Sequence, residues 1–342
     1  MQQGFWKQLE KPIIALAPMA DVTDVAFRRL FAQYGKPHVT WTEFVSADGL
    51  IRAPGDNPDE HGLSSKQKLL KDLEYSEGER PIVAQLFSSK PDMMEQAAAL
   101  VQSLGFDGID INMGCPDKNI EKQGCGAAMI KNPERAAEII AAAKRGAPNL
   151  PISVKTRIGF NSLDEFEPWV SFLLKQDIAC LTLHWRTRKE MSKVDAHWEF
   201  APRAAKLRGA IAPQTILLGN GDIKTIADAH EKVLTTGIDG VMIGRGIFGN
   251  PWFFNEHMTR EDDVTVAERL TVMIEHTKLF ETLLPHKSFA VMKKHYKAYV
   301  DGFKGAKELR LSLMEAANSG EVKDIVEAFL EANPVVEIER TD

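Results

Sequence analysis

The chain has 342 residues, of which 44% are hydrophobic and 26% are charged, as in a soluble globular protein with one large domain and one smaller domain. Its formal net charge of −6 excludes a globally basic nucleic-acid binder, so any affinity for RNA must come from a local patch. Three cysteines without a C-x-x-C pair exclude a disulfide framework, no apolar run reaches the length of about 18 residues of a membrane helix, and the N-terminus lacks the layout of a signal peptide, so we expect a cytoplasmic protein.

The first three quarters of the chain alternate short, β-branched apolar runs with amphipathic stretches. Segments such as 92–104 and 133–146 have apolar residues at helical spacing. Alternating strands and helices predict a parallel sheet, and eight such units within about 250 residues predict an α/β protein with a (β/α)8 TIM barrel. A doubly wound sheet ranks lower, because no G-x-G-x-x-G follows the first strand. The strand-like runs are 13–19, 38–44, 81–87, 107–113, 151–157, 179–185, 215–221 and 239–245.

The pattern becomes helical after about residue 260. The only later strand-like run is VVEIE in the tail, and EDDV (261–264) is a plausible linker. We therefore expect a catalytic barrel over residues 1–260, followed by a small all-α C-terminal domain over residues 261–342. The predicted helical segments are 266–284, 287–303, 306–318 and 321–333.

Unusual polar residues occur where the predicted strands end. Burying such groups is costly unless they have partners, and barrel enzymes place their active sites at the carboxyl ends of the strands. Several of them at one end of one barrel therefore predict an active site. They are Gln85, Asn112, Lys155, His184 and Asn220.

Two glycine-containing segments predict a phosphate site. GNGD (219–222) and GRG (244–246) follow the seventh and eighth strands, where barrels often bind phosphate, and Arg245 adds a charged fork. The residues alone thus favour a phosphorylated cofactor, with Lys155 and His184 facing its head.

Cys115 stands at the end of the fourth strand, in DGIDINMGCPDKN (107–119). A free cysteine is more often a buried, inert thiol than a catalytic group, so both readings stay open on position alone. Cys125 and Cys180 are expected to be structural. The histidines show no metal-ligand spacing, and no metal site is expected.

The motifs together resemble the tRNA-dihydrouridine synthase family. The matching segments are APMADVTDVAFRRL, INMGCPDKN with QGCGAAM, VKTRIG, LHWRTR, LLGNGDI and GVMIGRG, and MKKHYKAYVDGFKGAKELR is similar to that family's tRNA-binding domain. The resemblance implies an FMN-dependent (β/α)8 barrel with a helical C-terminal domain. It also implies reduction of the C5–C6 double bond of uridines in tRNA, with NADPH as the reductant.

The resemblance also implies roles for individual residues. Cys115 would donate a proton to C5 of the uracil, a role that suits a thiol with a pKa of about 8.5, while hydride from the flavin reaches C6. Asn112 would help to hold the base. Trp185 stands where the family usually has glycine, and we expect it to stack near the flavin or the base, or to narrow the pocket. The residues implied to bind the cofactor are Pro18, Met19, Ala20, Gln85, Lys155, His184, Asn220, Gly221, Asp222, Gly244 and Arg245.

A local basic cluster provides the expected tRNA surface despite the acidic total. Its charges fall in one helical region with Tyr296 and Tyr299 interleaved, although a charge run is often only a solvated helix face. Residues around the barrel mouth are expected to extend this basic cluster, among them Arg188, Lys189, Lys193, Lys118 and Lys122. Lys287 belongs to the cluster, and the residues predicted to bind the substrate there and at the mouth are Arg186, Lys293, Lys294, His295, Lys297, Lys304, Lys307 and Arg310.

Two other functions are compatible with parts of the sequence. A flavin barrel acting on a free pyrimidine, like a dihydroorotate dehydrogenase, would share the barrel and the loop acid but leaves the basic helical region unexplained. A non-catalytic tRNA-binding protein with a vestigial flavin site would not need the intact cysteine, lysine and phosphate-loop residues. We expect a monomer that binds tRNA and NADPH and does not bind a membrane.

Overall fold

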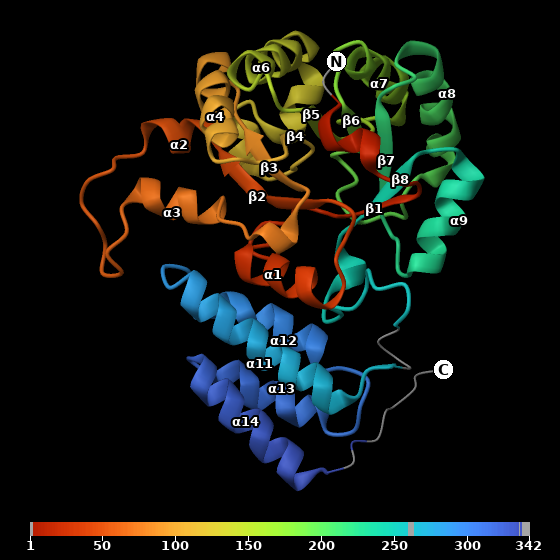
Figure 1. The fold of residues 1–342 in the computed structure, drawn as a ribbon. Helices are drawn as coiled ribbons and strands as arrows, with labels where there is room; N and C mark the ends of the chain where they lie inside the picture. The colour runs from red at the N-terminus through yellow and green to blue at the C-terminus, as the bar shows by residue number, and fades with distance from the viewer. Residues whose placement is uncertain (1–2, 259–262, 335, 337–342) are drawn as a thin grey trace.

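The computed structural model describes residues 3–258, 263–334 and 336 (Figure 1). The predicted domain boundary at residue 260 lies outside the described residues, as do half of the predicted linker (261–264) and most of the VVEIE run. Figure 1 shows the strands and their helices in the upper part of the molecule and a group of helices below them.

The eight predicted strands are all present and form one parallel sheet in the order β1-β8-β7-β6-β5-β4-β3-β2. The two edges of this sheet meet just before β2, where the Leu16 N–H donates to the Val39 carbonyl (3.2 Å) and the His38 N–H donates to the Ile14 carbonyl (2.9 Å). These contacts close the sheet and confirm the predicted (β/α)8 barrel. The strands are β1 Ile13–Leu16, β2 Thr40–Ser46, β3 Ile82–Phe87, β4 Gly108–Met113, β5 Ile152–Arg157, β6 Cys180–His184, β7 Ile216–Asn220 and β8 Gly240–Ile243.

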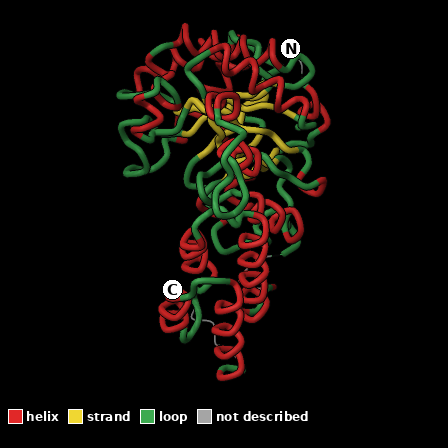
Figure 2. The backbone as a smooth tube through the Cα atoms, turned by 90° about the vertical axis from the view of Figure 1, so that its left-hand side faces the viewer, coloured by secondary structure: helices red, strands yellow, loops and turns green. Residues whose placement is uncertain are grey.

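Helices surround the strands on the outside, as the turned view shows (Figure 2). Several begin where a side chain accepts backbone N–H groups of the first turn: Asp24 caps α1, Asn132 caps α6 and Thr225 caps α9. The helices of this part are α1 Val25–Tyr34, α2 Ala47–Arg52, α3 Ser65–Asp72, α4 Pro91–Ser103, α5 Lys118–Lys122, α6 Pro133–Gly146, α7 Phe166–Leu174, α8 Ala201–Ile211 and α9 Ile226–Thr236.

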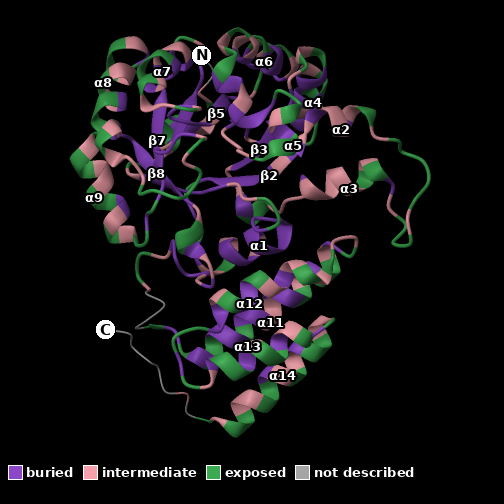
Figure 3. Ribbon diagram, turned by 180° about the vertical axis from the view of Figure 1, so that it is seen from behind, coloured by how far each residue is buried: buried purple, intermediate pink, exposed green. Residues whose placement is uncertain are grey.

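The strand period of two residues separates an apolar outer face from a partly polar barrel interior. In β4, Ile109 and Ile111 pack outward against the helices, so Asp110 and Asn112 point to the other face. All four side chains are buried, and Figure 3 shows strands such as β2 and β7 in the buried colour. The polar residues predicted at the strand ends therefore stand inside the barrel.

The C-terminal helices have a core of their own, which is shared with one barrel helix. Val25, Ala26 and Leu30 of α1 pack with Trp252 and with Tyr296, and α1 lies between the strands and the lower helices (Figure 1). No helix among the described residues is long and apolar enough to cross a membrane. The C-terminal helices are α11 Val266–Leu283, α12 Lys293–Tyr299, α13 Ala306–Glu315 and α14 Ser319–Ala332, with the 3-10 turn η7 Phe289–Met292 before α12.

An ion-pair cluster joins the two parts of the molecule. The Lys287 amine lies 2.8 Å from a Glu43 carboxylate oxygen of β2 and 3.1 Å from an Asp72 oxygen at the end of α3. Lys287 was expected to belong to the RNA-binding cluster, but its charge is neutralised by the barrel. Its position ties the C-terminal helices to the barrel.

Candidate active site

A hydrogen-bonded chain of side chains crosses the barrel interior from β5 to β3 and β4. The Ser153 hydroxyl donates to one Asp110 oxygen (2.7 Å) and the Gln85 side-chain N–H donates to the other (2.7 Å). The Asn112 side-chain N–H in turn donates to the Gln85 side-chain oxygen (2.9 Å). Burial raises the pKa of Asp110 to about 6. Asp110 and Ser153 were not predicted as site residues, although both lie at inward positions, two residues before Asn112 and Lys155.

This chain fixes the orientation of Asn112, and Asn112 fixes the loop that carries Cys115. Because its N–H group is engaged by Gln85, the Asn112 side-chain oxygen faces the loop and accepts the N–H groups of Gly114 (3.1 Å) and Cys115 (2.9 Å). The Cys115 carbonyl accepts the Ala127 N–H (2.9 Å). Both the N–H and the carbonyl group of Cys115 are therefore hydrogen-bonded, which fixes the backbone that carries the thiol.

Cys115 is half-buried, whereas Cys125 and Cys180 are buried. Burial raises the pKa of the Cys115 thiol, so the group stays protonated at neutral pH. Cys180 lies on β6 in the barrel interior, as expected of a structural cysteine. Of the three thiols, Cys115 is the one suited to deliver a proton.

Lys155 is held by Asn220 across the barrel mouth. Its amine donates to the Asn220 side-chain oxygen (3.3 Å), and the Asn220 N–H donates to the Met242 carbonyl (2.7 Å). Burial, with the Arg157 guanidinium nearby, lowers the pKa of Lys155 to about 8. Near neutral pH this amine is therefore mostly protonated, so it carries a positive charge and can donate hydrogen bonds. At a pH slightly above neutral it can lose its proton.

His184 is neutral in this environment. Burial and the charges of Arg157, Lys155 and Arg186 hold its pKa well below the usual value. Its Nε2 lies 3.2 Å from an Arg186 nitrogen. Because a guanidinium only donates, Nε2 must accept, and the ring proton is on Nδ1.

A cavity of about 950 Å³ opens beside these groups. Of the residues predicted to bind the cofactor, it is lined by all except Ala20 and Gln85; Asn112 and Cys115 also lie outside its lining. The remaining lining includes the loop from Ser192 to Ala196, Trp198 and Lys224. The predicted cofactor residues that share the cavity are Pro18, Met19, Lys155, His184, Asn220, Gly221, Asp222, Gly244 and Arg245.

Asp222 binds two arginines that line the cavity. Its carboxylate accepts hydrogen bonds from Arg186, from the Ala196 N–H (2.8 Å) and from Arg245 (3.1 Å). Although burial opposes it, the hydrogen bond from Arg186 lowers the pKa of Asp222, so this group is a carboxylate. Asp222 lines the cavity and holds the Arg186 and Arg245 side chains in place, and its direct contact with the cofactor stays a prediction.

Gly221 makes the turn beside Asp222 possible. Its φ of +135° is reached readily only by glycine, and a Cβ atom there would lie 2.8 Å from the Ala196 Cβ. The backbone can therefore pass close to the loop after β6 at the point where both line the cavity.

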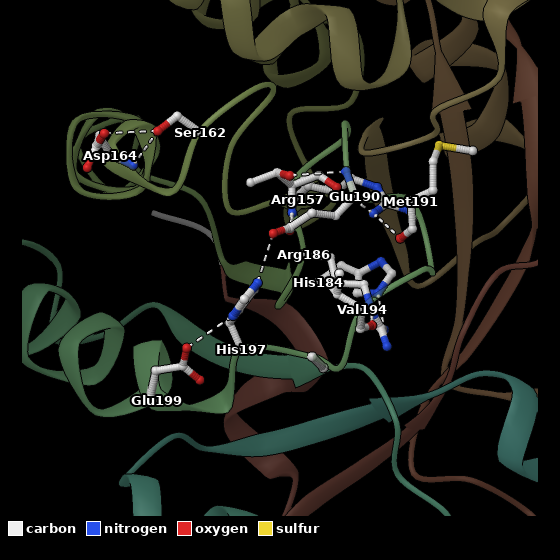
Figure 4. Close-up of polar contacts among 12 residues, drawn as sticks. Arg157, Ser162, Asp164, His184, Arg186, Glu190, Met191, Val194, His197 and Glu199 are labelled. Atoms are coloured by element: carbon white, nitrogen blue, oxygen red, sulfur yellow. Dashed lines mark hydrogen bonds and ion pairs between the residues drawn. The ribbon is translucent and has the colours of Figure 1, made fainter.

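Two residues predicted to bind the substrate are buried. Arg186 is 2% exposed, lines the cavity and donates to the Val194 carbonyl (2.7 Å), so it belongs to the cavity wall and not to an RNA-facing surface (Figure 4). His295 is 1% exposed and packs against Phe27 and His276. The prediction for His295 is wrong, because this face of α12 turns toward α1 and α11.

The other basic residues divide into capping and exposed groups. The Lys293 amine donates to the Met314 carbonyl, and Arg310 donates to the Val300 carbonyl (2.7 Å), so both stabilise the ends of neighbouring helices. The predicted substrate-binding residues that are exposed at the surface are Lys294, Lys297, Lys304 and Lys307.

Trp185 does not reach the cavity. It is fully buried, its ring centroid lies 5.7 Å from that of Trp198, and it belongs to the core between the sheet and the helices. The expectation that it stacks near a cofactor or narrows the pocket is wrong. Trp198, which the sequence analysis did not single out, lines the cavity and donates to the Gly221 carbonyl (2.9 Å).

The loop after β6 is held by charged side chains that the sequence analysis overlooked or assigned elsewhere. Arg157 donates to the carbonyls of Thr187 (3.1 Å) and Met191 (2.9 Å), and His197 lies between Glu190 and Glu199, 3.0 Å from each (Figure 4). Arg157 also donates to the Gly114 carbonyl (3.0 Å). Its place two residues after Lys155, on the same strand face, was the available signal.

Among the described residues, no group of three or more His, Cys, Asp or Glu side chains could hold a metal ion. The site therefore consists of a half-buried thiol, a lysine with a lowered pKa, a neutral histidine and a cavity that Arg186 and Arg245 line.

Comparison with known proteins identifies relatives over nearly the whole chain. Residues 15–333 match the family described as dihydrouridine synthase (Dus). The chain is 41% identical over 333 residues to a protein of Bacillus subtilis (strain 168) named probable tRNA-dihydrouridine synthase 2, covering 96% of this chain and 97% of that protein. It is also 41% identical over 331 residues to the probable tRNA-dihydrouridine synthase of Staphylococcus aureus (strain MRSA252), with 96% of each chain covered.

Proposed function

Because this chain belongs to the dihydrouridine synthase family, we propose that it reduces the C5–C6 double bond of uridines in tRNA to give 5,6-dihydrouridine, with FMN as its cofactor and NADPH as the reductant. The observation that carries this proposal is Cys115, a protonated thiol held by Asn112 at the end of β4 beside a cofactor-sized cavity. We further infer that the enzyme works as a monomer in the cytoplasm.

The cavity residues fit FMN by their donors and by their shape. Lys155 and His184 offer a positive or polar edge, and Arg245 and Arg186, which Asp222 holds, offer charged donors for a phosphate. Gly221 leaves room that a side chain would fill, since its Cβ would collide with Ala196. When bound, FMN would take hydride from NADPH and deliver it to C6 of the uracil.

Cys115 would supply the proton that completes the reduction. As the hydride bonds to C6, the π electrons of the C5–C6 double bond move to C5 and form a bond to the proton from Sγ. The thiolate that remains then regains a proton from water. Burial keeps the thiol protonated before this step. A positioned acid of this kind typically contributes about 10²- to 10⁴-fold to the rate.

Lys155 and Asn112 would act on charge and orientation. A protonated Lys155 stabilises electron-rich oxygen and nitrogen at the cavity edge, and its neighbour Asn220 fixes the direction of the amine. Asn112 orients the loop of Cys115 through two backbone N–H groups and so aims the thiol. The Gln85–Asp110 pair behind it keeps the Asn112 amide from turning over.

The exposed lysines of the C-terminal helices would hold tRNA phosphates. Lys294 interacts electrostatically with Asp21, which lies in the loop after β1. Pro18 and Met19 of the same loop line the cavity, so this part of α12 faces the same end of the barrel as the cavity. A uridine must leave its stack to enter a buried site, and the surrounding RNA is then held by its backbone.

The test uses purified protein and tRNA from a strain that lacks dihydrouridine. The protein should be yellow and should release FMN on denaturation, and with NADPH it should raise the mass of a tRNA fragment by one hydride and one proton. Cys115→Ala should keep its flavin and its reduction by NADPH but lose product formation, while the control Cys125→Ala stays active. A colourless protein that cannot be reconstituted with FMN contradicts the proposal, as does activity confined to a free pyrimidine.

A further inference from the structure

The loop that carries Cys115 is joined to the loop after β6 by an ion pair between residues far apart in the sequence. Arg188 binds Glu121 of α5 through both of its fork positions: Nε donates to Oε1, and Nη2 lies 2.5 Å from Oε2. The two side chains are 24% and 14% exposed, respectively. This two-point geometry fixes the relative position of the two loops more tightly than a single contact would.

Contacts other than the ion pair also hold Arg188 in place. Its backbone N–H donates to the Gly159 carbonyl (2.9 Å), and its guanidinium lies 5.5 Å from the centre of the Phe160 ring. The hydrogen bonds that Arg188 donates to Glu121 raise the pKa of Arg188 further, so the guanidinium stays charged. An arginine held in this way loses little side-chain entropy when it forms the pair.

Glu121 transmits this contact to the thiol through a short rigid segment. Asp117 caps α5 by accepting the N–H groups of Asn119 (2.8 Å) and Ile120 (3.2 Å), and only Pro116 separates Asp117 from Cys115. The Glu121 N–H donates to the Asp117 carbonyl (2.9 Å), so the carboxylate stands one helical turn after Asp117, which lies two residues after Cys115.

The other end of the connection is the cavity wall. The loop that begins with Arg186 and Arg188 continues through Ser192 to Ala196, which line the cavity. Its Val194 carbonyl and Ala196 N–H are bound by Arg186 and Asp222. The position of the cavity wall and the position of the cysteine loop are thus mechanically linked.

We propose that the Glu121–Arg188 pair is a positioning device that couples the Cys115 loop to the cavity loop and holds the thiol in place for proton transfer. This role rests on the proposed function of Cys115 as the acid. It differs from a direct role of Arg188 in binding tRNA, since the guanidinium faces a protein carboxylate.

Glu121→Gln separates these two roles, because they predict opposite effects. Positioning predicts that oxidation of the reduced enzyme by tRNA in a single turnover slows about 10- to 100-fold, while the Kd for tRNA and the reduction by NADPH stay the same. If Arg188 were instead an RNA ligand, freeing it from Glu121 would tighten tRNA binding and leave the rate unchanged. That result would overturn the proposal.

The exchanged pair Glu121→Arg with Arg188→Glu tests whether the contact itself matters. It should restore a large part of the single-turnover rate, whereas Arg188→Glu alone should not. The control is Glu95→Gln, which removes the partner of Arg145 in a surface pair between α4 and α6 (2.7 Å) and should change nothing. Equal losses in the control and in Glu121→Gln would overturn the proposal.

Thiol alkylation gives a readout that does not depend on the proposed reaction. Iodoacetamide labelling of Cys115, followed peptide by peptide in the mass spectrometer, should be about tenfold faster in Glu121→Gln than in the unmodified enzyme and should slow again in the exchanged pair. Unchanged labelling overturns the positioning role. Failure of the unmodified enzyme to form dihydrouridine would overturn the proposed function and leave the labelling result intact.

Discussion

Trp185 packs directly against Gly219 of the neighbouring strand β7: a Cβ atom on Gly219 would lie 2.8 Å from the Trp185 indole nitrogen and 2.8 Å from the Trp198 ring. The space that Gly219 leaves is the space that the large ring occupies. A tryptophan after β6 is therefore accommodated behind the sheet, and it leaves the cavity on the other side open.

Gly219→Ala is expected to destabilise the protein. An added methyl group in this packed core forces the two indole rings to move, which typically costs about 1 to 3 kcal/mol of unfolding free energy. Urea unfolding of the two proteins measures this loss. Gly209→Ala is the matched control, since no atom lies within 4 Å of its added Cβ. An unchanged unfolding free energy in Gly219→Ala would contradict this packing.

The barrel and its polar interior could be predicted because both follow from short sequence periods. Apolar Ile109 and Ile111 alternate with Asp110 and Asn112, which is enough to define a strand and its two faces. Parallel strands bring their ends to one side of a barrel, so the grouping of Asn112 with Lys155 also followed.

The partners of charged side chains could not be predicted in the same way. Arg188 and Glu121 are 67 residues apart, and nothing in the sequence pairs them. Arg186 was expected to extend the RNA-binding patch to the barrel mouth, but the Asp222 carboxylate stabilises it inside. Such pairs depend on the tertiary structure.

The burial of His295 had a signal that was overlooked. Met292, His295, Tyr296 and Tyr299 recur at the spacing of one helix face, and all four are buried, whereas Lys294 and Lys297 occupy the opposite face. Counting the histidine with the lysines ignored this period. The division of α12 into a packed face and a charged face follows from its sequence.

Asn112→Ala is expected to slow product formation about 100-fold. The variant loses the acceptor for the Gly114 and Cys115 N–H groups, so the thiol loses its aim, and displacements of about 1 Å can cost a factor of this size. Stopped-flow oxidation of the reduced enzyme by tRNA measures the effect. Reduction of the flavin by NADPH, which does not use the thiol, is the internal control. A full rate in Asn112→Ala would remove the asparagine from this role.

The affinity of the flavin-free protein for FMN should weaken as the pH rises through about 8. Lys155 has its pKa lowered to about 8, and an electron-rich partner binds better to the protonated amine. Above that pH the protonated fraction falls up to tenfold per unit, and Kd rises accordingly. Fluorescence titrations between pH 7 and 9 measure this. Lys155→Arg keeps its charge over this range and should show a flat profile. The same slope in both proteins would assign the titration to another group.

Two buried histidines should make the protein less stable in mild acid. Burial lowers the pKa of His276 to about 3 and holds that of His295 well below its usual value, while both titrate near 6.5 in the unfolded chain. The unfolded state therefore binds more protons as the pH falls below 6.5. Stability is lost by an amount that approaches about 1.4 kcal/mol per pH unit for each histidine.

In the part of the chain that the structure describes, no carboxylate near these rings offsets this loss. Phe27 of α1 packs against both rings, Tyr299 lies 3.4 Å from His276, and Lys294 adds a positive charge that lowers the pKa of His295 further. Urea unfolding at several pH values between 7.5 and 5 should show a smaller decrease in His276→Leu than in the unmodified protein. Comparing the two proteins cancels the opposite contribution of Asp24 and Asp110, whose raised pKa values of about 6 favour the folded state as the pH falls. Parallel curves would contradict the prediction.

Replacing Lys297 and Lys307 together by alanine should weaken tRNA binding in a salt-dependent way. Both side chains are exposed on the C-terminal helices, and each phosphate contact that is lost reduces the slope of log K against log salt by about 0.7 to 0.9. Binding isotherms at several salt concentrations measure the slope, which we expect to fall by about 1.5 in the double variant. Lys206→Ala, which removes an exposed charge from the barrel helix α8, should leave the slope unchanged. Because neither residue touches the cavity, the FMN content and the reduction by NADPH should stay the same. A double variant with the full salt slope would move the RNA surface away from these helices.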